Sequence, residues 1–370
     1  MRSIVYLIGT GPGAPDLISL RGHRCLQRAD VVIYDHLVNA RLLEAAHPAA
    51  ERIDVGSAAP QHSDQEAICY LLAEKAREGK VIARLKWGDP FVFDQGGEEA
   101  LFLHEQGIRF EVVPGIPAAI GVPAYAGIPV TYHGGGDTVT IVRGHEDEGR
   151  EKTRVDWDSL ARLDGTIVCY AGPKQLPKML DALLAHGRAA GESAAVVVNG
   201  TLPSQRTISG TLGELARDVK EHPVGGPAML VVGKVVGFRE HLRWFDARPL
   251  FGHRVLVMRS IEQPDDLRDR LENQGAMVVV ENDTHHDIYR MLLDGKFDVV
   301  TFTTASAFLA FAAKYGADQA SDLLAHTVVA TMGPSAADAA ARARVAPAVH
   351  LPAGSTPELV QAIVAHLKKV

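Results

Sequence analysis

The sequence is poor in cysteine. Only three cysteines, Cys25, Cys69 and Cys169, stand among 370 residues, and no two of them have the C-x-x-C spacing. An odd and scattered set argues against a disulfide framework and against a zinc site. We therefore expect a protein of a reducing compartment, the cytoplasm, with no bound metal.

Long hydrophobic runs and an excess of basic charge are also missing. No apolar stretch approaches the ~18 residues of a membrane span, and Ile4–Ile8 is too short for the apolar part of a signal peptide. The formal net charge is -7, which argues against nucleic acid as a partner. No G-x-S-x-G nucleophile motif occurs. We expect a small-molecule partner, and neither a membrane nor nucleic acid.

What the sequence does contain is a regular alternation of short apolar runs and helix-length segments, such as Asp64–Glu78 and Lys174–His186. This alternation is typical of an α/β fold with mostly parallel strands. The predicted strands are Ile4–Ile8, Val31–Tyr34, Val81–Leu85, Phe110–Val113, Thr138–Val142, Thr166–Tyr170, Ala194–Val198 and Ala228–Val236.

The alternation breaks at residues 237–252 and then starts again, with a strand at Val255–Met258, a helix at Ala305–Tyr315 and a last helix at Pro357–Lys369. The remaining ~120 residues suffice for one small doubly wound domain. We predict domains at 1–242 and 252–370, the first with subdomains at about 1–130 and 137–242.

Glycine-bearing loops follow several predicted strands. The first, "GTGPGAPD", has Gly9, Gly11 and Gly13 two apart, whereas a dinucleotide loop needs G-x-G-x-x-G. Pro12 also removes an N–H that a pyrophosphate would need. The loops within 84–99, 112–121, 126–136 and 196–210 repeat the pattern. Together they predict a composite pocket, and a nicotinamide-dependent oxidoreductase stays open as an alternative.

In order and spacing these loops resemble the tetrapyrrole methylase family, and within it the members that methylate uroporphyrinogen III. The resemblance spans about residues 3–240 and rests on "GTGPGAPDLISLRG", "YDHLV", "RLKWGDPFVF", "VVPGIPAA", "AGIPVT" and "GTLPSQRTISGTL". It implies two α/β subdomains that bind S-adenosylmethionine between them, a homodimer, and C-methylation of uroporphyrinogen III toward precorrin-2.

The resemblance also assigns roles to residues of this chain. Asp35, in "YDHLV", stands at the position of the proton acceptor, where a carboxylate could take the proton that leaves the macrocycle after methylation. Arg21, Lys86 and Arg206 are basic residues near the cleft that could meet the substrate's carboxylates. The predicted cofactor contacts are Pro12, Gly88, Asp89, Val92, Pro117, Ala118, Ala171 and Gly200.

Several motif positions depart from the family. The lysine assigned as proton donor is Ser57, a glycine before the G-D-P turn is Trp87, and a methionine of a cofactor loop is Ala171. Gly-Arg is replaced by Asp94-Gln95, and His-Arg by Tyr132-His133. Two alternatives therefore stay open: a catalytically impaired, regulatory protein that binds the cofactor or a tetrapyrrole, and a methylase of another acceptor.

The C-terminal segment resembles part of the uroporphyrinogen-III synthase family, on "RVLVMRSIEQPDDLRDRLENQGAMVVV", "FDVVTFTTASAFLAF" and "TVVATMGPSAADAA". That family has a second domain inserted in the first. Here only residues 281–296 separate Val280 from Phe297, so the inserted domain is missing. We predict a small flavodoxin-like α/β domain without synthase activity.

Overall fold

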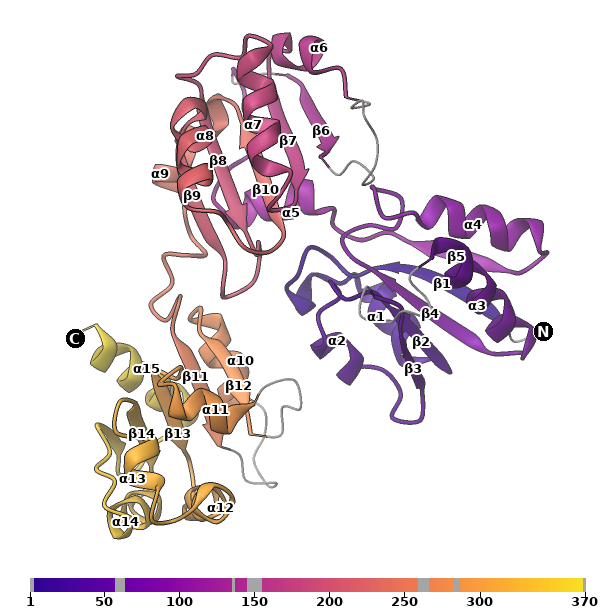
Figure 1. Ribbon diagram of the computed structural model, residues 1–370. Coiled ribbons are helices and arrows are strands. Elements are labelled where there is room, and N and C mark those ends of the chain that lie inside the picture. Colours follow the sequence, from indigo (N-terminus) through magenta and orange to yellow (C-terminus); the bar gives the residue numbers. More distant parts are fainter. Residues whose placement is uncertain are drawn as a thin grey trace. The chain divides into compact units, whose positions relative to one another are not determined.

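The computed structural model describes residues 3–56, 64–134, 137–144, 155–258, 266–281 and 287–368. The chain divides into two compact units, Met1–Arg243 and Trp244–Val370. The first unit holds two five-stranded sheets and the second unit holds one (Figure 1).

The first sheet has the order β3-β2-β4-β1-β5, with every pair parallel. Helices α3 and α4 cover one face, and α1 and α2 cover the other. The strands are β1 (Ile4–Gly9), β2 (Val31–Tyr34), β3 (Glu51–Asp54), β4 (Val81–Lys86) and β5 (Phe110–Val113). The helices are α1 (Leu20–Gln27), α2 (Arg41–Glu44), α3 (Gln65–Arg77) and α4 (Gly96–Glu105).

The second sheet has the order β6-β7-β10-β8-β9 and is mixed, because only β6 and β7 pair in parallel. Alternate residues of its strands face α7 and α8 on one side and α5 on the other. The strands are β6 (Val139–Arg143), β7 (Thr166–Ala171), β8 (Ser193–Val198), β9 (Arg206–Thr211) and β10 (Ala228–Val232). The helices are α5 (Ala118–Tyr125), α6 (Trp157–Arg162), α7 (Leu176–Ala185), α8 (Leu212–Glu221) and α9 (Arg239–Leu242).

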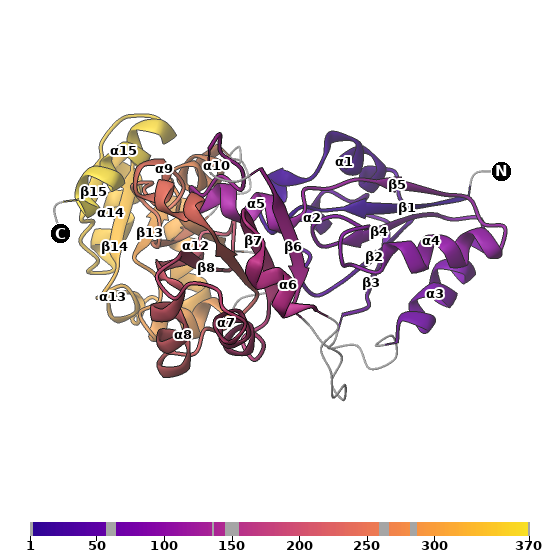
Figure 2. The same ribbon diagram turned by 90° about the horizontal axis from the view of Figure 1, so that it is seen from above.

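The second unit is a parallel sheet of order β12-β11-β13-β14-β15, the flavodoxin-like order that the sequence predicted. Helices α10 and α15 cover one face (Figure 2), and α11–α14 cover the other. The strands are β11 (Arg254–Met258), β12 (Met277–Val280), β13 (Val299–Phe302), β14 (Val328–Met332) and β15 (Val349–Leu351). The helices are α10 (Asp266–Asn273), α11 (Ile288–Leu293), α12 (Ala305–Tyr315), α13 (Ala320–Leu323), α14 (Pro334–Arg342) and α15 (Thr356–Leu367).

The α/β prediction is confirmed, and two details of it are wrong. The run Ala228–Val236 is not one strand, because β10 ends at Val232 and Gly233, at φ 146°, leads into a 3₁₀ helix. Mostly parallel pairing holds for two sheets but not for the second. The sequence did not predict the strands β3, β9 and β15. Each of them lies at the edge of its sheet, is partly exposed and lacks a continuous apolar run.

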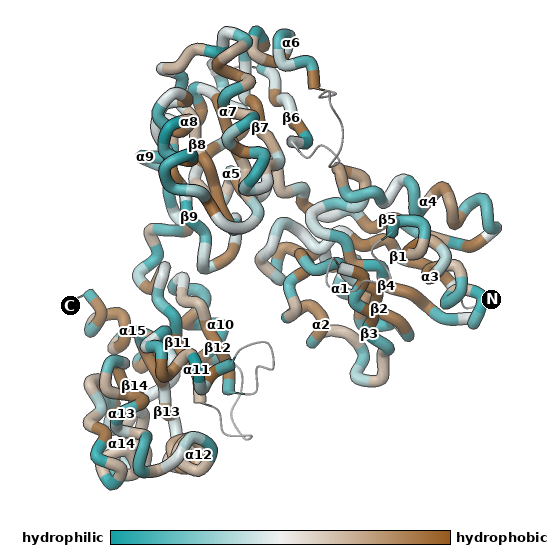
Figure 3. The backbone as a smooth tube through the Cα atoms, in the orientation of Figure 1, coloured by the Kyte–Doolittle hydropathy of each residue, from teal (hydrophilic) through white to brown (hydrophobic). Residues whose placement is uncertain are grey.

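Hydrophobic residues concentrate along the strands and on the inner sides of the helices (Figure 3). This distribution is that of helices packed on sheets, where each sheet is buried on both faces. Within the described ranges no helix is long and apolar enough to cross a membrane.

Candidate functional site

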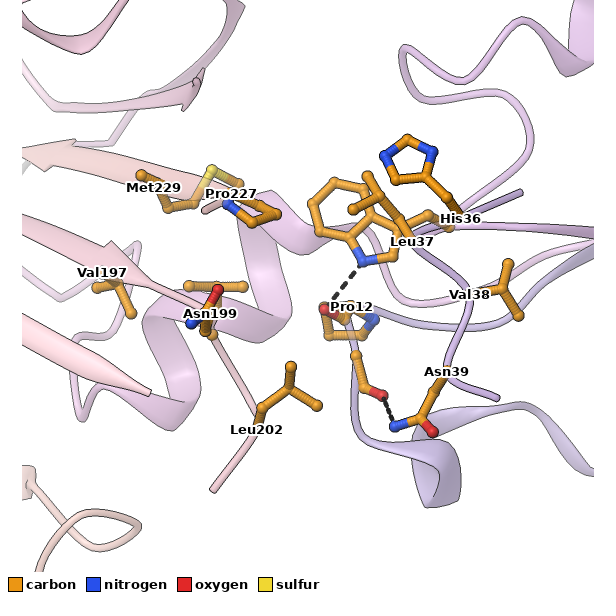
Figure 4. Close-up of a pocket in the computed structure, with 15 residues that line it drawn as sticks. Pro12, His36, Leu37, Val38, Asn39, Val197, Asn199, Leu202, Pro227 and Met229 are labelled. Atoms are coloured by element: carbon orange, nitrogen blue, oxygen red, sulfur yellow. Dashed lines mark hydrogen bonds between the residues drawn. The ribbon is translucent and has the colours of Figure 1, made fainter. Parts of the chain in front are cut away.

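A cavity of about 320 Å³ opens among the loops that follow β1, β2, β4 and β8 and the segment that leads into β10. Val197, Asn199, Leu202 and Met229 line one side, and Val38 and Asn39 line the other (Figure 4). Its volume lies at the lower end of the ~300–1,000 Å³ typical of small-molecule sites. The cavity therefore joins strand-end loops of both sheets of the first unit, as the composite pocket predicted from the glycine loops requires.

Helix α5, with the sequence AAIGVPAY, lets these loops approach one another because Ala118, Ala119 and Gly121 are small. A Cβ at Gly121 would lie 2.8 Å from Cγ of Pro12, and a Cβ at Gly200 would lie 2.4 Å from Cγ1 of Val122. On the same helix the Ala119 N–H donates to the hydroxyl of Tyr170 at 3.2 Å. Glycine at 121 and 200 is thus needed for the close approach that shapes the cavity.

Trp87 forms a wall of this cavity. Its indole Nε1 donates to the carbonyl oxygen of Pro12 at 3.1 Å (Figure 4), and its ring meets that of Tyr170 edge to face at 6.1 Å between centroids. Trp87, His36 and Leu37 also line a second cavity of about 560 Å³. The two cavities are therefore neighbours that share one wall.

The second cavity has a charged floor. Because side chains alternate along a strand, Arg84 and Lys86 of β4 both point toward α4, where they meet the fully buried Glu99. Lys86 Nζ lies 2.8 Å and Arg84 Nη2 lies 3.1 Å from Glu99 Oε1. Arg84 Nη2 also donates to Oδ1 of Asp35 at 2.9 Å. Two cations thus face two carboxylates.

Burial opposes ionisation of Glu99, but the charges of Arg84 and Lys86 outweigh it and hold the pKa of Glu99 below its usual value. A third carboxyl, Asp94, lies on the loop between β4 and α4. Its Oδ2 is buried without a hydrogen-bond partner among the described residues, and the Nζ of Lys86 is 4.0 Å away. Burial raises the pKa of Asp94 to about 7, against the opposing influence of Lys86.

Of the eight predicted cofactor contacts, Pro12 and Gly200 line the first cavity. The backbones of Gly11 and Gly88 exchange two hydrogen bonds, of 2.8 and 3.1 Å, which place the β4 loop beside Pro12. Pro117 caps α5, and Val92 packs with Ala118 in one core cluster.

The side chains of two predicted cofactor contacts, Asp89 and Ala171, make contacts within the protein. The carboxylate of Asp89 accepts from the N–H groups of Phe91 and Gly115 at 2.9 and 3.0 Å, so it holds two loops together. Ala171 packs with the α7 and α8 cluster, on the sheet face opposite Tyr170. A ligand contact by Ala171 would therefore come from its main chain.

The three residues predicted to meet substrate carboxylates are not brought together. Lys86 is 1% exposed and paired with Glu99, although it lines the charged cavity. Arg21 is exposed and pairs with Glu111, and Arg206 is an exposed residue at the start of β9. Neither arginine is among the described residues that line the two cavities.

Sequence reasoning missed Glu99 and Tyr170. The sequence carried one signal for Glu99. In "GGEEALFLHE" it falls on the buried side of the helix, and a buried glutamate is expected to have a charged or hydrogen-bonding partner. Tyr170 lies near the end of β7 and cannot be distinguished in the sequence from any other core aromatic residue. The sequence therefore gives no signal that its hydroxyl accepts a hydrogen bond from α5. In the described part of the chain no group of His, Cys, Asp and Glu is arranged to hold a metal.

Comparison with known proteins identifies the first unit. Residues 4–216, more than half of the 370, match the family described as Tetrapyrrole (Corrin/Porphyrin) Methylases. The chain belongs to the tetrapyrrole methylases. Residues 244–361 match the family described as Uroporphyrinogen-III synthase HemD.

Individual members of the tetrapyrrole methylases give the same result. The chain is 39% identical over 318 residues to the uroporphyrinogen-III C-methyltransferase of Bacillus subtilis, covering 84% of this chain but only 65% of that protein. It is 45% identical to the S-adenosyl-L-methionine-dependent uroporphyrinogen III methyltransferase of Methanosarcina barkeri, covering 64% and 94%. The crystal structure of uroporphyrin-III C-methyl transferase from Thermus thermophilus complexed with S-adenyl homocysteine matches with TM-score 0.55 and 36% identity, covering 63% and 98%.

Among the departures from the tetrapyrrole methylase motifs, Ser57 lies outside the described residues. Trp87 and Asp94 lie at the two cavities. Tyr132 is exposed, with its ring 4.2 Å from that of Phe238 between centroids. The departures that the structure describes thus include a new wall and a new carboxyl at the candidate site.

Proposed function

We propose that this chain transfers methyl groups from S-adenosylmethionine to pyrrole carbons of uroporphyrinogen III, toward precorrin-2. Relatives named for this reaction support the proposal, and one structural neighbour carries S-adenosyl homocysteine. The observation that carries it is the pair of adjoining cavities, one apolar and one charged, with Asp35 in the charged one.

The first cavity fits the cofactor. Val122, Val197 and Met229 offer an apolar surface to a flat adenine ring. The glycine loops, with Gly200 tight against Val122, present main-chain groups to the polar parts of the molecule. When bound there, the cofactor supplies an electrophilic methyl group on a sulfonium sulfur. We propose that Pro12, Gly88, Val92, Pro117, Ala118, Gly200 and the main chains of Asp89 and Ala171 hold it.

Asp35 is the proposed proton acceptor. Each methyl transfer adds a positive charge to the acceptor, and a proton must then leave its ring. Arg84 fixes Oδ1 of Asp35 at 2.9 Å, which orients the carboxylate at the wall of the charged cavity. Orientation of a base in this way contributes to general base catalysis.

The test is anaerobic incubation of the protein with uroporphyrinogen III and S-adenosylmethionine, followed by mass and absorbance analysis for methylated products. Binding of S-adenosylhomocysteine is measured by calorimetry in the same preparation. Methylated product is the expected result. Absence of product despite cofactor binding would contradict the proposed reaction, and absence of binding would contradict the cofactor site as well.

A second candidate is a protein that binds the cofactor or a tetrapyrrole without turnover, and the engagement of Lys86 by Glu99 favours it. Ser57→Lys separates the two candidates. The substitution restores the family's lysine and should raise turnover in an impaired methylase, whereas it should change nothing in a cleft that serves another purpose.

For the second unit we propose no uroporphyrinogen-III synthase activity. Between β12 and β13 the described chain holds only the short helix α11, which leaves little room for an inserted domain. Conversion of hydroxymethylbilane by the purified chain would contradict this proposal.

We also predict that the protein is a homodimer and that it is cytoplasmic. Light scattering tests the oligomeric state, and cell fractionation tests the location.

A further inference from the structure

Among the described residues, the contact cluster of Arg84, Lys86, Asp35, Glu99 and Asp94 at the charged cavity contains one more carboxyl than its cations can balance. Arg84 and Lys86 supply two positive charges. Arg84 forms ion pairs with Asp35 and Glu99, and Lys86 forms one with Glu99, at distances of 2.8–3.1 Å. Asp94 is the third carboxyl, and its nearer cation, the Nζ of Lys86, is 4.0 Å away and already donates to Glu99. The Asp94 side chain is 27% exposed, but burial of its Oδ2 without a hydrogen bond among the described residues favours the neutral form of this carboxyl.

The loop holds Asp94 in this place. Phe93 and Gln95, on either side of it, have left-handed backbones at φ 59° and 57°, a region that non-glycine residues seldom occupy. Phe93 packs edge to face on Tyr170 at 5.4 Å between centroids, and Gln95 precedes the first turn of α4. The packing of Phe93 on Tyr170 and the start of α4 directly after Gln95 hold the loop that carries Asp94.

We propose that Asp94, in its protonated form, binds a carboxylate group of the acceptor by donating an O–H hydrogen bond to it, and that ionised Asp94 rejects the same group. This inference deepens the proposed function and depends on it. The neutral cavity accepts one carboxylate at a time through the carboxyl O–H. Loss of the proton leaves an unbalanced negative charge that repels an anionic acceptor, since like charges at short range in a poorly solvated site repel strongly.

Four charged groups contribute to the electrostatic environment of Asp94. Arg84 and Lys86 face it from β4, Glu99 from α4, and Asp35 from the loop after β2. Two further titratable side chains line the same cavity: His36, and Asp64 at the N-terminus of α3, whose Oδ1 caps the helix. The pKa of Asp94, raised by burial to about 7, places the change within the accessible pH range.

The experiment measures binding of uroporphyrin III, the stable oxidised analogue, to the full-length protein by fluorescence between pH 6 and 8.5. If only the protonated form binds, proton uptake approaches one per ligand above pH 7, and the wild-type affinity falls about 30-fold over this range. Asp94→Asn, which is neutral at every pH and keeps a donor, should retain the low-pH affinity throughout. His36→Gln is the matched control, and it should keep the wild-type pH dependence.

Four outcomes overturn the inference. Equal slopes in wild type and Asp94→Asn would assign the pH dependence to another group, and loss of the slope in His36→Gln would assign it to the histidine. An affinity that rises with pH would give Asp94 the opposite role. If wild type binds S-adenosylhomocysteine but no uroporphyrin III at any pH, the proposed function itself fails, and the inference fails with it. Equal S-adenosylhomocysteine affinity in wild type and Asp94→Asn shows that this variant is folded, and an unchanged urea-unfolding midpoint shows the same for His36→Gln.

Discussion

Arg84 reaches Asp35 across the first sheet, from the middle of β4 to the loop after β2, with Nη2 2.9 Å from Oδ1. Arg84 is 1% exposed and also donates to Glu99. One buried guanidinium therefore fixes both the proposed base and the buried glutamate. We expect removal of this guanidinium to lower both the free energy of unfolding and the methyltransferase activity.

Replacement of Arg84 by methionine should lower the free energy of unfolding by about 3–5 kcal/mol, because it leaves a buried carboxylate without part of its counter-charge. Urea unfolding measures this change. Arg162→Met removes an exposed pair with Asp158 on α6 and should cost less than about 1 kcal/mol. Equal effects of the two substitutions would contradict the structural role of Arg84.

Asp94 should make the protein less stable as the pH rises. Its pKa is about 7 in the folded protein and ~3.9 in the unfolded chain, so the folded state binds the extra proton between these values. Stability from this group is present below pH ~4 and is lost as the pH rises to 7. Asp94→Asn should be more stable than wild type by ~2–4 kcal/mol at pH 8, with little difference at pH 4.

Thermal or urea unfolding of both proteins across this pH range checks the prediction. An unchanged difference between wild type and Asp94→Asn at all pH values would show that the carboxyl is ionised throughout.

Trp87 should report on ligand binding. Trp87 lines the first cavity, whereas the other two tryptophans, Trp157 and Trp244, lie elsewhere. S-adenosylhomocysteine should therefore change the intrinsic fluorescence of wild type, and Trp87→Phe should lose that change while Trp157→Phe keeps it. A signal that survives in Trp87→Phe would place the ligand away from this wall.

A methyl group at residue 200 should weaken cofactor binding. The Cβ of Gly200→Ala would meet Val122 at 2.4 Å, and the stiff valine must then shift into the cavity. We expect at least a tenfold loss of affinity, or about 1.4 kcal/mol, by calorimetry. Gly191→Ala is the control, since its Cβ meets nothing within 4 Å. Unchanged affinity in Gly200→Ala would contradict this placement of the cofactor.

The sequence by itself determined the fold class, the restart near residue 250 and the family. Each of these follows from patterns that are local along the chain. Apolar runs such as Val31–Tyr34 form the same strand in any α/β packing, and turn glycines such as Gly11 and Gly88 have left-handed backbones that other residues disfavour. Edge strands such as β9 escaped prediction because they lack a continuous apolar run.

Only the tertiary structure decided which charges meet. From the sequence we expected Lys86 to be available to bind substrate carboxylates. In the structure the alternation of side chains along β4 and the position of α4 bring its ammonium group into an ion pair with the buried Glu99. Trp87 and Asp94 read as departures from a motif, and their positions at the cavities follow from the packing of α5 and the β4 loop. Contacts between residues far apart in the chain depend on that packing, and the burial it creates sets which carboxyl keeps its proton.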